Sequence, residues 1–160
     1  MNTEAFEEKL AKAKNYAYRL LTYRARSCYE VRERLKRKGF SQKLIDKTVE
    51  ELKKLNYLND ENFASMWVDV RLSTNPCGRR LAEQELRKKG IDEKIVSNIT
   101  ETYFNENSER KIAHELALRK VRKYTGIDNA KNRKRLCDFL ARRGFPLEIV
   151  YEVLGEVFQE

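Results

Sequence analysis

The hexapeptide LKRKGF, residues 35–40, recurs as LRKKGI at residues 86–91 and as LARRGF at residues 140–145. The glycines of the three copies lie 51 and 54 residues apart. The similarity extends outward, because apolar residues recur eight positions before each glycine and six and thirteen positions after it: Val31, Ala82 and Leu136; Ile45, Val96 and Val150; Leu52, Tyr103 and Val157. A regular period of this length is typical of repeat proteins, so we expect three copies of one structural unit.

Each copy has the pattern of one helix that ends and another that begins. The leucine of the hexapeptide follows the earlier apolar residue by four positions, so both share one helix face. The glycine predicts the end of that helix, because glycine adopts the left-handed conformation at low cost. The next helix is expected to begin after an N-cap at Ser41 or Asp92, or with Pro146 in its first turn.

Apolar periodicity predicts a further helix upstream in each unit, over residues 4–24, 60–72 and 108–123. In the second of these we expect Phe63, Trp67 and Val70 to face the core, so Trp67 is interpreted as a core residue. No segment shows the sustained alternation of a strand. We therefore predict an all-α fold of three tandem three-helix repeats in an elongated, curved array: residues 1–56, 57–106 and 107–160.

The composition favours helix and excludes several classes of protein. Among 160 residues only 6 are Gly and 2 are Pro, which excludes collagen, and 3 Cys exclude a disulfide scaffold. Apolar residues recur throughout, which argues against disorder of the whole chain. The first ten residues do not have the pattern of a signal peptide, and no apolar run is long enough to span a membrane. We expect a cytoplasmic protein that is a monomer.

Charge is distributed unevenly along the predicted units. Residues 1–56 carry 15 basic and 8 acidic side chains, residues 57–106 carry 7 and 9, and residues 107–160 carry 12 and 8. The ends are therefore basic and the middle is slightly acidic, within a net charge of +9. This pattern differs from a uniform stripe that coats DNA. It suits a partner of mixed charge, such as a protein already loaded on nucleic acid.

Clustered basic residues are the candidate contacts for such a partner or for phosphates. A residue two positions after the inward leucine lies about 200° around the helix, so Arg37, Lys88 and Arg142 should point to solvent. Cations in a last helical turn also favour the helix dipole, which is the alternative explanation for them. The full candidate set is Arg24, Arg26, Arg34, Lys36, Arg37, Lys38, Arg79, Arg80, Lys88, Lys89, Arg133, Lys134, Arg135, Arg142 and Arg143.

No arrangement of residues predicts catalysis. His114 has no evident partner, and neither a phosphate-binding loop nor a dinucleotide fingerprint is present. Cys28, Cys77 and Cys137 lie far apart without a histidine cluster, which argues against zinc. The acidic pairs at residues 60–61 and 92–93 open predicted helices, where carboxylates suit capping better than acid–base work. We expect no enzymatic activity, no cofactor and no metal.

The order and spacing of these residues resemble the regulatory protein RecX family from about Ala17 to Phe158. The first unit carries Leu20-Leu21, Arg24, Arg26-Ser27, Glu30-Val31, Leu35 and Gly39-Phe40. The second is the most similar, with Tyr57, Asp60, Phe63-Ala64, Trp67, Arg71, Gly78, Arg79-Arg80-Leu81, Glu85-Leu86 and Lys89-Gly90-Ile91. The third carries Ala113, Lys120, Leu140, Arg142-Arg143-Gly144-Phe145 and Ile149. One departure is the loop Asn75-Pro76-Cys77-Gly78, where the family commonly has a basic residue.

This resemblance implies tandem three-helix repeats and negative regulation of the RecA recombinase in DNA repair, recombination and the SOS response. Members bind the RecA nucleoprotein filament along its groove across adjacent subunits and inhibit ATP hydrolysis, strand exchange and co-protease activity. Some members also contact DNA. The fifteen basic residues are then the candidate contacts with RecA and with DNA.

Two other classes of function stay open at this point. A direct DNA- or RNA-binding helical module would use the basic balance and would bind bare nucleic acid with a steep salt dependence. A helical scaffold for an acidic protein partner would not respond to DNA.

Overall fold

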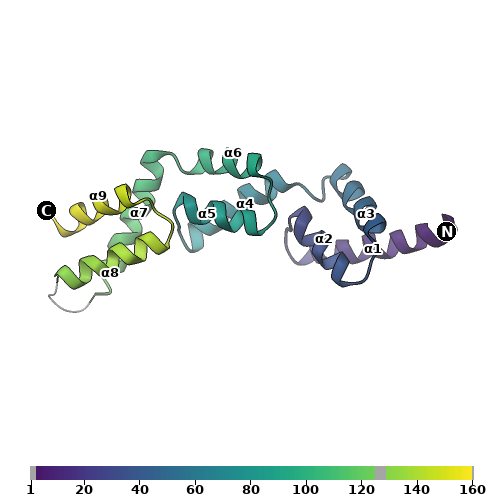
Figure 1. Cartoon of the computed structure of the whole chain (residues 1–160), viewed down its shortest axis with the longest axis horizontal. Helices are drawn as coiled ribbons and strands as arrows, with labels where there is room; N and C mark the ends of the chain where they lie inside the picture. The colour runs from purple at the N-terminus through teal and green to yellow at the C-terminus, as the bar shows by residue number, and fades with distance from the viewer. Residues whose placement is uncertain (1–2, 125–128, 160) are drawn as a thin grey trace.

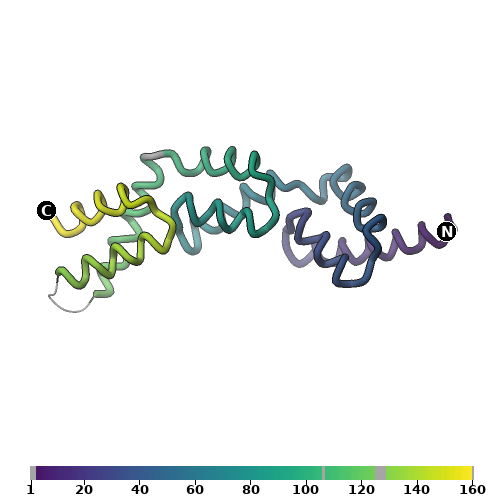
Figure 2. Tube along the Cα trace, viewed as in Figure 1, coloured from purple at the N-terminus to yellow at the C-terminus, as the bar shows by residue number. Residues whose placement is uncertain are grey.

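The computed structural model describes residues 3–124 and 129–159, and these form nine helices and no strand. The helices are α1 (Thr3–Tyr23), α2 (Cys28–Arg37), α3 (Gln42–Lys54), α4 (Asp60–Thr74), α5 (Arg79–Lys88), α6 (Glu93–Tyr103), α7 (Glu106–Val121), α8 (Asn129–Arg142) and α9 (Leu147–Phe158). Figure 1 shows them as three groups of three along one long axis, and Figure 2 shows the two ends of the chain at opposite ends of the array. The expected tandem three-helix repeats are confirmed, while their exact residue limits stay a prediction.

Local sequence explains where several helices begin. Ser27 forms a capping box at the start of α2, because its hydroxyl accepts from the Glu30 N–H while the Glu30 carboxylate accepts from the Ser27 N–H. Asp92 caps α6 by accepting from the Lys94 N–H, as predicted. Ser41 is the N-cap residue of α3, but its side chain makes no capping hydrogen bond.

The repeat glycines end the middle helix of each group. Gly39, Gly90 and Gly144 have φ angles of 92°, 73° and 86°, so each has the left-handed conformation that the sequence predicts. The N–H of the residue after each glycine donates back to the carbonyl of the leucine that begins the hexapeptide: Leu35, Leu86 and Leu140. This closure turns the chain toward the third helix of the unit.

Each group of helices packs around its own core. Val31, Leu35, Ile45, Val49 and Leu52 are buried in the first, with Ala13 and Ala17 of α1. The second core contains Phe63, Val68, Leu86, Val96 and Phe104. The third contains Leu136, Leu140, Phe145, Val150 and Leu154. The periodic apolar positions of the repeat are therefore the ones that fill the cores, except that Tyr103 and Val157 are half-buried beside them.

The prediction for Val70 is wrong, because its side chain is 59% exposed. The buried side of α4 instead carries Phe63, Ala64 and Val68, with Trp67 packed partly against them. The next inward position is occupied by Arg71, whose Nε lies 3.1 Å from a carboxylate oxygen of Glu85 on α5. An ion pair thus takes the place on the helix stripe that apolar periodicity alone would give to a hydrophobic residue.

The first and second units meet where the start of α2 lies against the end of α5. The Ser27 hydroxyl donates to the Lys89 carbonyl at 2.7 Å, and the Cys28 N–H donates to the Asp60 carboxylate of α4 at 2.8 Å. Tyr29 packs so closely over Gly90 that a Cβ there would overlap the tyrosine side chain. We call this contact the first joint.

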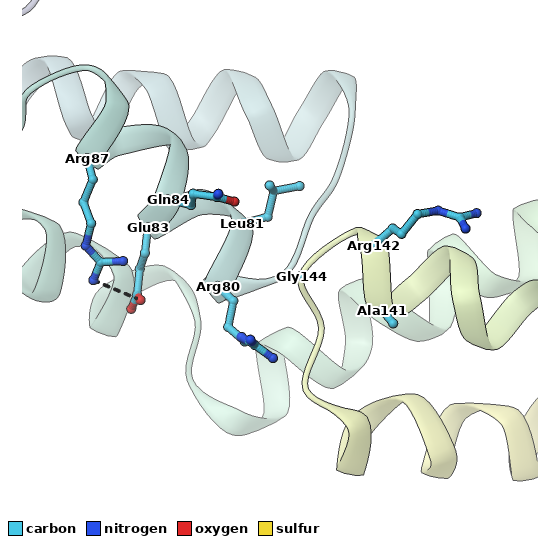
Figure 3. Close-up of a pocket in the computed structure, with 8 residues that line it drawn as sticks. All are labelled: Arg80, Leu81, Glu83, Gln84, Arg87, Ala141, Arg142 and Gly144. Carbon is cyan, nitrogen blue, oxygen red and sulfur yellow. Dashed lines mark hydrogen bonds and ion pairs between the residues drawn. The ribbon is translucent and has the colours of Figure 1, made fainter.

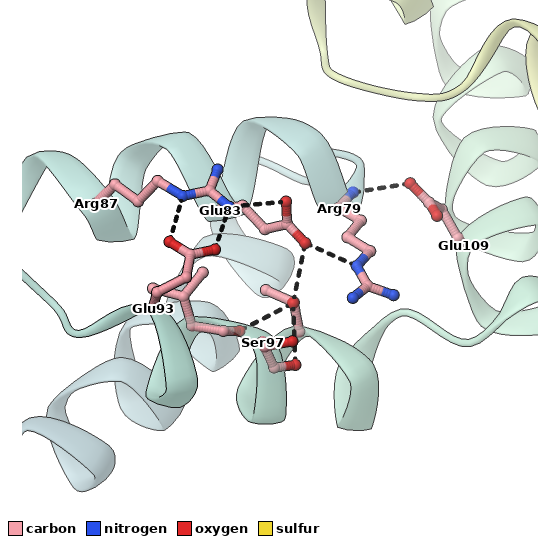
Figure 4. Close-up of polar contacts among 8 residues, drawn as sticks. Arg79, Glu83, Arg87, Glu93, Ser97 and Glu109 are labelled. Carbon is pink, nitrogen blue, oxygen red and sulfur yellow. Dashed lines mark hydrogen bonds and ion pairs between the residues drawn. The ribbon is translucent and has the colours of Figure 1, made fainter.

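The second joint repeats the first with different residues. The Gly78 N–H donates to the Arg143 carbonyl at 2.8 Å, and Gly144 packs against Leu81. The Arg79 N–H, at the start of α5, donates to the Glu109 carboxylate of α7 at 2.7 Å, as Figure 4 shows. In both joints, therefore, a carboxylate from the first helix of the next unit caps the middle helix of the unit before it.

The two joints differ in their apolar content. Ile112 of α7 packs against both the second and the third core. Among residues 3–124 and 129–159, no apolar side chain is shared in this way by the first and second cores. The second joint is therefore the more hydrophobic of the two.

Glu109 gives the second joint a pH dependence, because burial raises the pKa of this carboxyl above its ordinary value of 4.5 and Glu83 acts in the same direction, against the Arg79 N–H. The folded protein then holds this proton more tightly than the unfolded chain. The contribution to stability is present below pH 4.5 and is lost as pH rises through the folded pKa.

Glu109→Gln should therefore lose less unfolding free energy than the parent protein between pH 4.5 and about 7 in urea titrations. Glu101→Gln, at an exposed position on α6, is the control and should reproduce the parent profile; a parent-like profile for Glu109→Gln would contradict the assignment.

Candidate functional site

Four of the predicted basic residues come together in the first unit. Arg24, Arg26, Arg34 and Arg37 line one pocket of about 180 Å³ beside the start of α2. Two of them make contacts within the unit: Arg24 lies 2.9 Å from the Glu30 carboxylate, and Arg26 Nε donates to the Leu20 carbonyl. Arg34 and Arg37 are exposed and form no ion pair with any described residue. They are the two cations of this pocket that have no such contact within the unit.

A second cluster crosses the second joint. Its pocket of about 410 Å³ is lined by Arg80, Leu81, Glu83, Gln84 and Arg87 of α5 and by Ala141, Arg142 and Gly144 from the end of α8. Figure 3 shows Arg80 on the α5 side and Arg142 on the α8 side. Arg87 is already paired with Glu83 and Glu93, as Figure 4 shows.

Arg80 and Arg142 differ from Arg87, because neither has an ion-pair partner in the part of the chain that the structure describes. Both are exposed. Arg142 also lines a neighbouring pocket of about 450 Å³ with Arg135 and Lys120. Two units thus each contribute an available arginine to the lining of the pocket at the second joint. Guanidinium groups bind carboxylates and phosphates in the same planar, two-point fashion.

The remaining predicted residues are not gathered into these clusters. Lys36 and Lys134 are exposed, Arg133 is half-buried, and Lys38 lies over the Tyr16 ring at 5.9 Å. Arg79 is paired with Glu83 at 2.8 Å. These positions stay predictions as partner contacts.

The basic pair before each glycine divides into two roles. The first members, Arg37, Lys88 and Arg142, are all exposed, as the helix geometry predicts. Of the second members, Lys89 and Arg143 belong to the joints. Lys89 supplies its carbonyl to Ser27 and places its ammonium 3.6 Å from Glu30, and Arg143 donates to Pro76 O at 3.0 Å. Sequence alone did not separate these roles.

The first joint also has a pocket beside it. Glu30, Trp67, Glu85, Lys88 and Lys89 line a space of about 450 Å³. Trp67 is half-buried, with the Lys89 ammonium 5.9 Å from its ring. Two carboxylates balance two lysines here, whereas the pocket at the second joint has three arginines and one glutamate.

The structure describes the surroundings of two thiols and of the one histidine. Burial raises the pKa of Cys77 to about 11, and burial with Asp60 raises that of Cys28 to about 11, so both thiols are protonated at neutral pH and are poor nucleophiles. His114 lies at the protein surface, 3.5 Å from Glu156. No group of metal-ligating side chains occurs among residues 3–124 and 129–159. In the same residues, no helix is long and apolar enough to cross a membrane.

Sequence reasoning missed the residues that build the joints. Asp60 was expected to cap its own helix, yet its carboxylate accepts from Cys28 in the preceding unit. Ser27 and Gly78 both lie twelve residues before a repeat glycine. That shared spacing, together with a small residue at both places, is the signal that could have identified them.

Family models match the chain in three consecutive segments. Residues 13–52 match the first three-helix domain of RecX, residues 59–98 the second and residues 108–154 the third. The matched segments coincide with the three groups of helices and include both sides of each joint.

Individual relatives are similar over almost the whole chain. The regulatory protein RecX of Amycolatopsis mediterranei (strain U-32) is 34% identical over 154 residues, which cover 96% of this chain and 87% of the relative. That of Chlorobium phaeobacteroides (strain BS1) is 37% identical over 150 residues, with 92% and 95% covered. The crystal structure of RecX from Lactobacillus salivarius has the same fold, with a TM-score of 0.84, 23% identity and 96% and 99% of the two chains covered.

Proposed function

This chain belongs to the RecX family of regulatory proteins, and on that premise we propose that it is a negative regulator of the RecA recombinase. It binds the RecA–DNA filament across adjacent subunits and thereby inhibits ATP hydrolysis, strand exchange and co-protease activity. The chain acts by binding and contributes no catalytic group.

The observation that carries this proposal is the series of available arginines along an extended array. Arg34 and Arg37 in the first unit, and Arg80 and Arg142 across the second joint, are exposed cations without ion-pair partners among the described residues. Because the units follow one another along a single axis, these cations are spaced to reach a partner at more than one point. Such multipoint binding raises affinity without requiring any one strong contact.

Inhibition follows if the array binds one state of the filament better than another. A ligand shifts an equilibrium only by its differential affinity for the two states. An array that bridges neighbouring subunits holds their relative placement, so it opposes any change in that placement that ATP turnover needs. The effect then requires far fewer regulators than recombinase subunits when each one blocks growth of a filament or promotes its disassembly.

The direct test is DNA-dependent ATP hydrolysis by RecA of the same organism, titrated with this protein. We expect strong inhibition well below one regulator per recombinase subunit, because one bound array affects several subunits. Unchanged hydrolysis at equimolar protein would contradict the proposal. If that result is accompanied by salt-sensitive binding to bare DNA, the chain is a nucleic-acid-binding module instead.

A further inference from the structure

The structure contains the same contact surface three times, once at the end of each middle helix. We define the socket of a unit as the last turn of its middle helix with the repeat glycine: Lys38–Gly39, Lys89–Gly90 and Arg143–Gly144. In the second and third units the socket is occupied by the start of the preceding middle helix. The carbonyl of Lys89 accepts from Ser27, and the carbonyl of Arg143 accepts from Gly78.

No described residue occupies the socket of the first unit in this way. A Cβ built on Gly39 would have no atom within 4 Å, whereas one on Gly90 or Gly144 would overlap the neighbouring unit. A pocket of about 360 Å³ lies here, lined by Lys9, Lys38, Gly39, Phe40, Ser41 and Leu44. The residues that receive a helix start in the other two units are thus accessible in the first.

The third unit does not repeat the helix start that Ser27 and Gly78 provide at the same position of the first two units. By repeat spacing, the residue of the third unit that corresponds to Ser27 and Gly78 is Asn132, twelve positions before Gly144. Asn132 lies within α8, three residues after the helix begins at Asn129. Its backbone is therefore inside a helix, so the third unit has no helix start at this position of the repeat.

The charge around the free socket is reversed relative to the occupied ones. At both joints the first helix of the unit contributes a carboxylate, from Asp60 or Glu109, to the incoming helix start. In the first unit the residue of α1 that lines the pocket is Lys9, and Lys38 lies beside it. Lys9 thus takes the place of a carboxylate, while Lys38 has basic counterparts in Lys89 and Arg143. Without the carboxylate, the two lysines favour an incoming segment that carries negative charge.

We propose that the free socket of the first unit binds the start of a helix in a partner protein, with an acidic first turn. The chemistry follows from the occupied sockets: a small N-cap residue donates to the Lys38 carbonyl, and a Tyr or Leu side chain covers Gly39, as Tyr29 and Leu81 cover Gly90 and Gly144. Aspartate or glutamate in the first turn then faces Lys9. Acidic first turns are common in helices because they suit the dipole.

The probe is a synthetic helical peptide with a blocked N-terminus that begins with Ser, Asp, Tyr and Glu, compared with a peptide that carries Asn and Gln instead of the two acids. Titrated into the full-length ¹⁵N-labelled protein, the acidic peptide should shift the amide signals of Gly39, Phe40 and Ser41 and leave Gly90 and Gly144 unchanged. Lys9→Glu should weaken its binding about tenfold, since it replaces an attraction by a repulsion. Lys47→Glu is the matched control, because Lys47 is exposed on α3 and does not line the pocket.

Three results would overturn the proposal: no amide shifts at Gly39 to Ser41, equal weakening by Lys9→Glu and Lys47→Glu, or shifts of these amides by a single-stranded oligonucleotide but not by the peptide. The last result would identify a phosphate site. The peptide experiment contains no recombinase, so its outcome is separate from that of the ATP hydrolysis assay. The socket proposal can fail while the regulatory function stands, and the reverse also holds.

Discussion

Gly144→Ala is expected to destabilise the protein far more than Gly39→Ala, although both glycines end equivalent helices. Both have a left-handed φ, 86° at Gly144 and 92° at Gly39. A residue with a Cβ in this left-handed conformation costs about 1–2 kcal/mol in backbone strain at either position. At Gly144 the added Cβ would also lie 2.5 Å from the backbone N and the Cβ of Leu81, while at Gly39 nothing lies within 4 Å. Overpacking of this kind costs about 1–3 kcal/mol more.

The measurement is the free energy of unfolding in urea for the parent protein and the two variants, with small-angle scattering for the overall dimensions of the array. Gly39→Ala controls for the strain, because it repeats the backbone change without the collision. We expect Gly144→Ala to change the scattering profile, since the second joint must open to admit the methyl group. Equal destabilisation by the two variants, with unchanged scattering, would show that this joint does not depend on close approach at Gly144.

The double variant Arg80→Glu/Arg142→Glu is expected to require at least about tenfold more protein for half-maximal inhibition of RecA ATP hydrolysis, which corresponds to about 1.4 kcal/mol of binding free energy. Both side chains are exposed and line the pocket at the second joint. Neither has an ion-pair partner among the described residues, so their reversal removes no structural contact. The difference in inhibition between the parent protein and the double variant should decrease as salt is added, because salt screens the attraction between these arginines and the partner.

The control for the double variant is Lys47→Glu/Lys94→Glu, which makes the same change in net charge at exposed positions that line neither arginine pocket. Circular dichroism should give the same helix content for both double variants. If the control loses as much inhibition as the arginine variant, net charge alone drives binding and the pocket has no particular role. Arg79 and Arg143 are unsuitable for this test, because they hold contacts within and between units.

The features that sequence predicted are those set by local geometry. The hexapeptide predicts the ends of the middle helices because a left-handed residue at that point suits glycine, and the three φ angles agree. Helix periodicity likewise predicts that Arg37 and Arg142 are exposed. Both inferences need only the residues within a few positions along the chain.

The features that sequence did not predict depend on how units meet. Asp60 accepts from Cys28, 32 residues away, and Glu109 accepts from Arg79, 30 residues away. No local rule relates these pairs until the units are placed side by side. The same holds for Arg143. It belongs to the same basic pair as Arg142, but its side chain donates to the Pro76 carbonyl at the second joint. The joints had to be known before the fifteen candidate cations could be divided into those that hold units together and those that are available to a partner.

The presence of Ile112 in two cores at once gives the array an uneven stiffness. The second and third units share an apolar side chain and therefore resist rotation as one longer body, whereas the first unit is attached mainly through polar contacts and Tyr29. We therefore expect rotation between units to occur at the first joint before the second, because the first and second cores share no apolar side chain among the described residues.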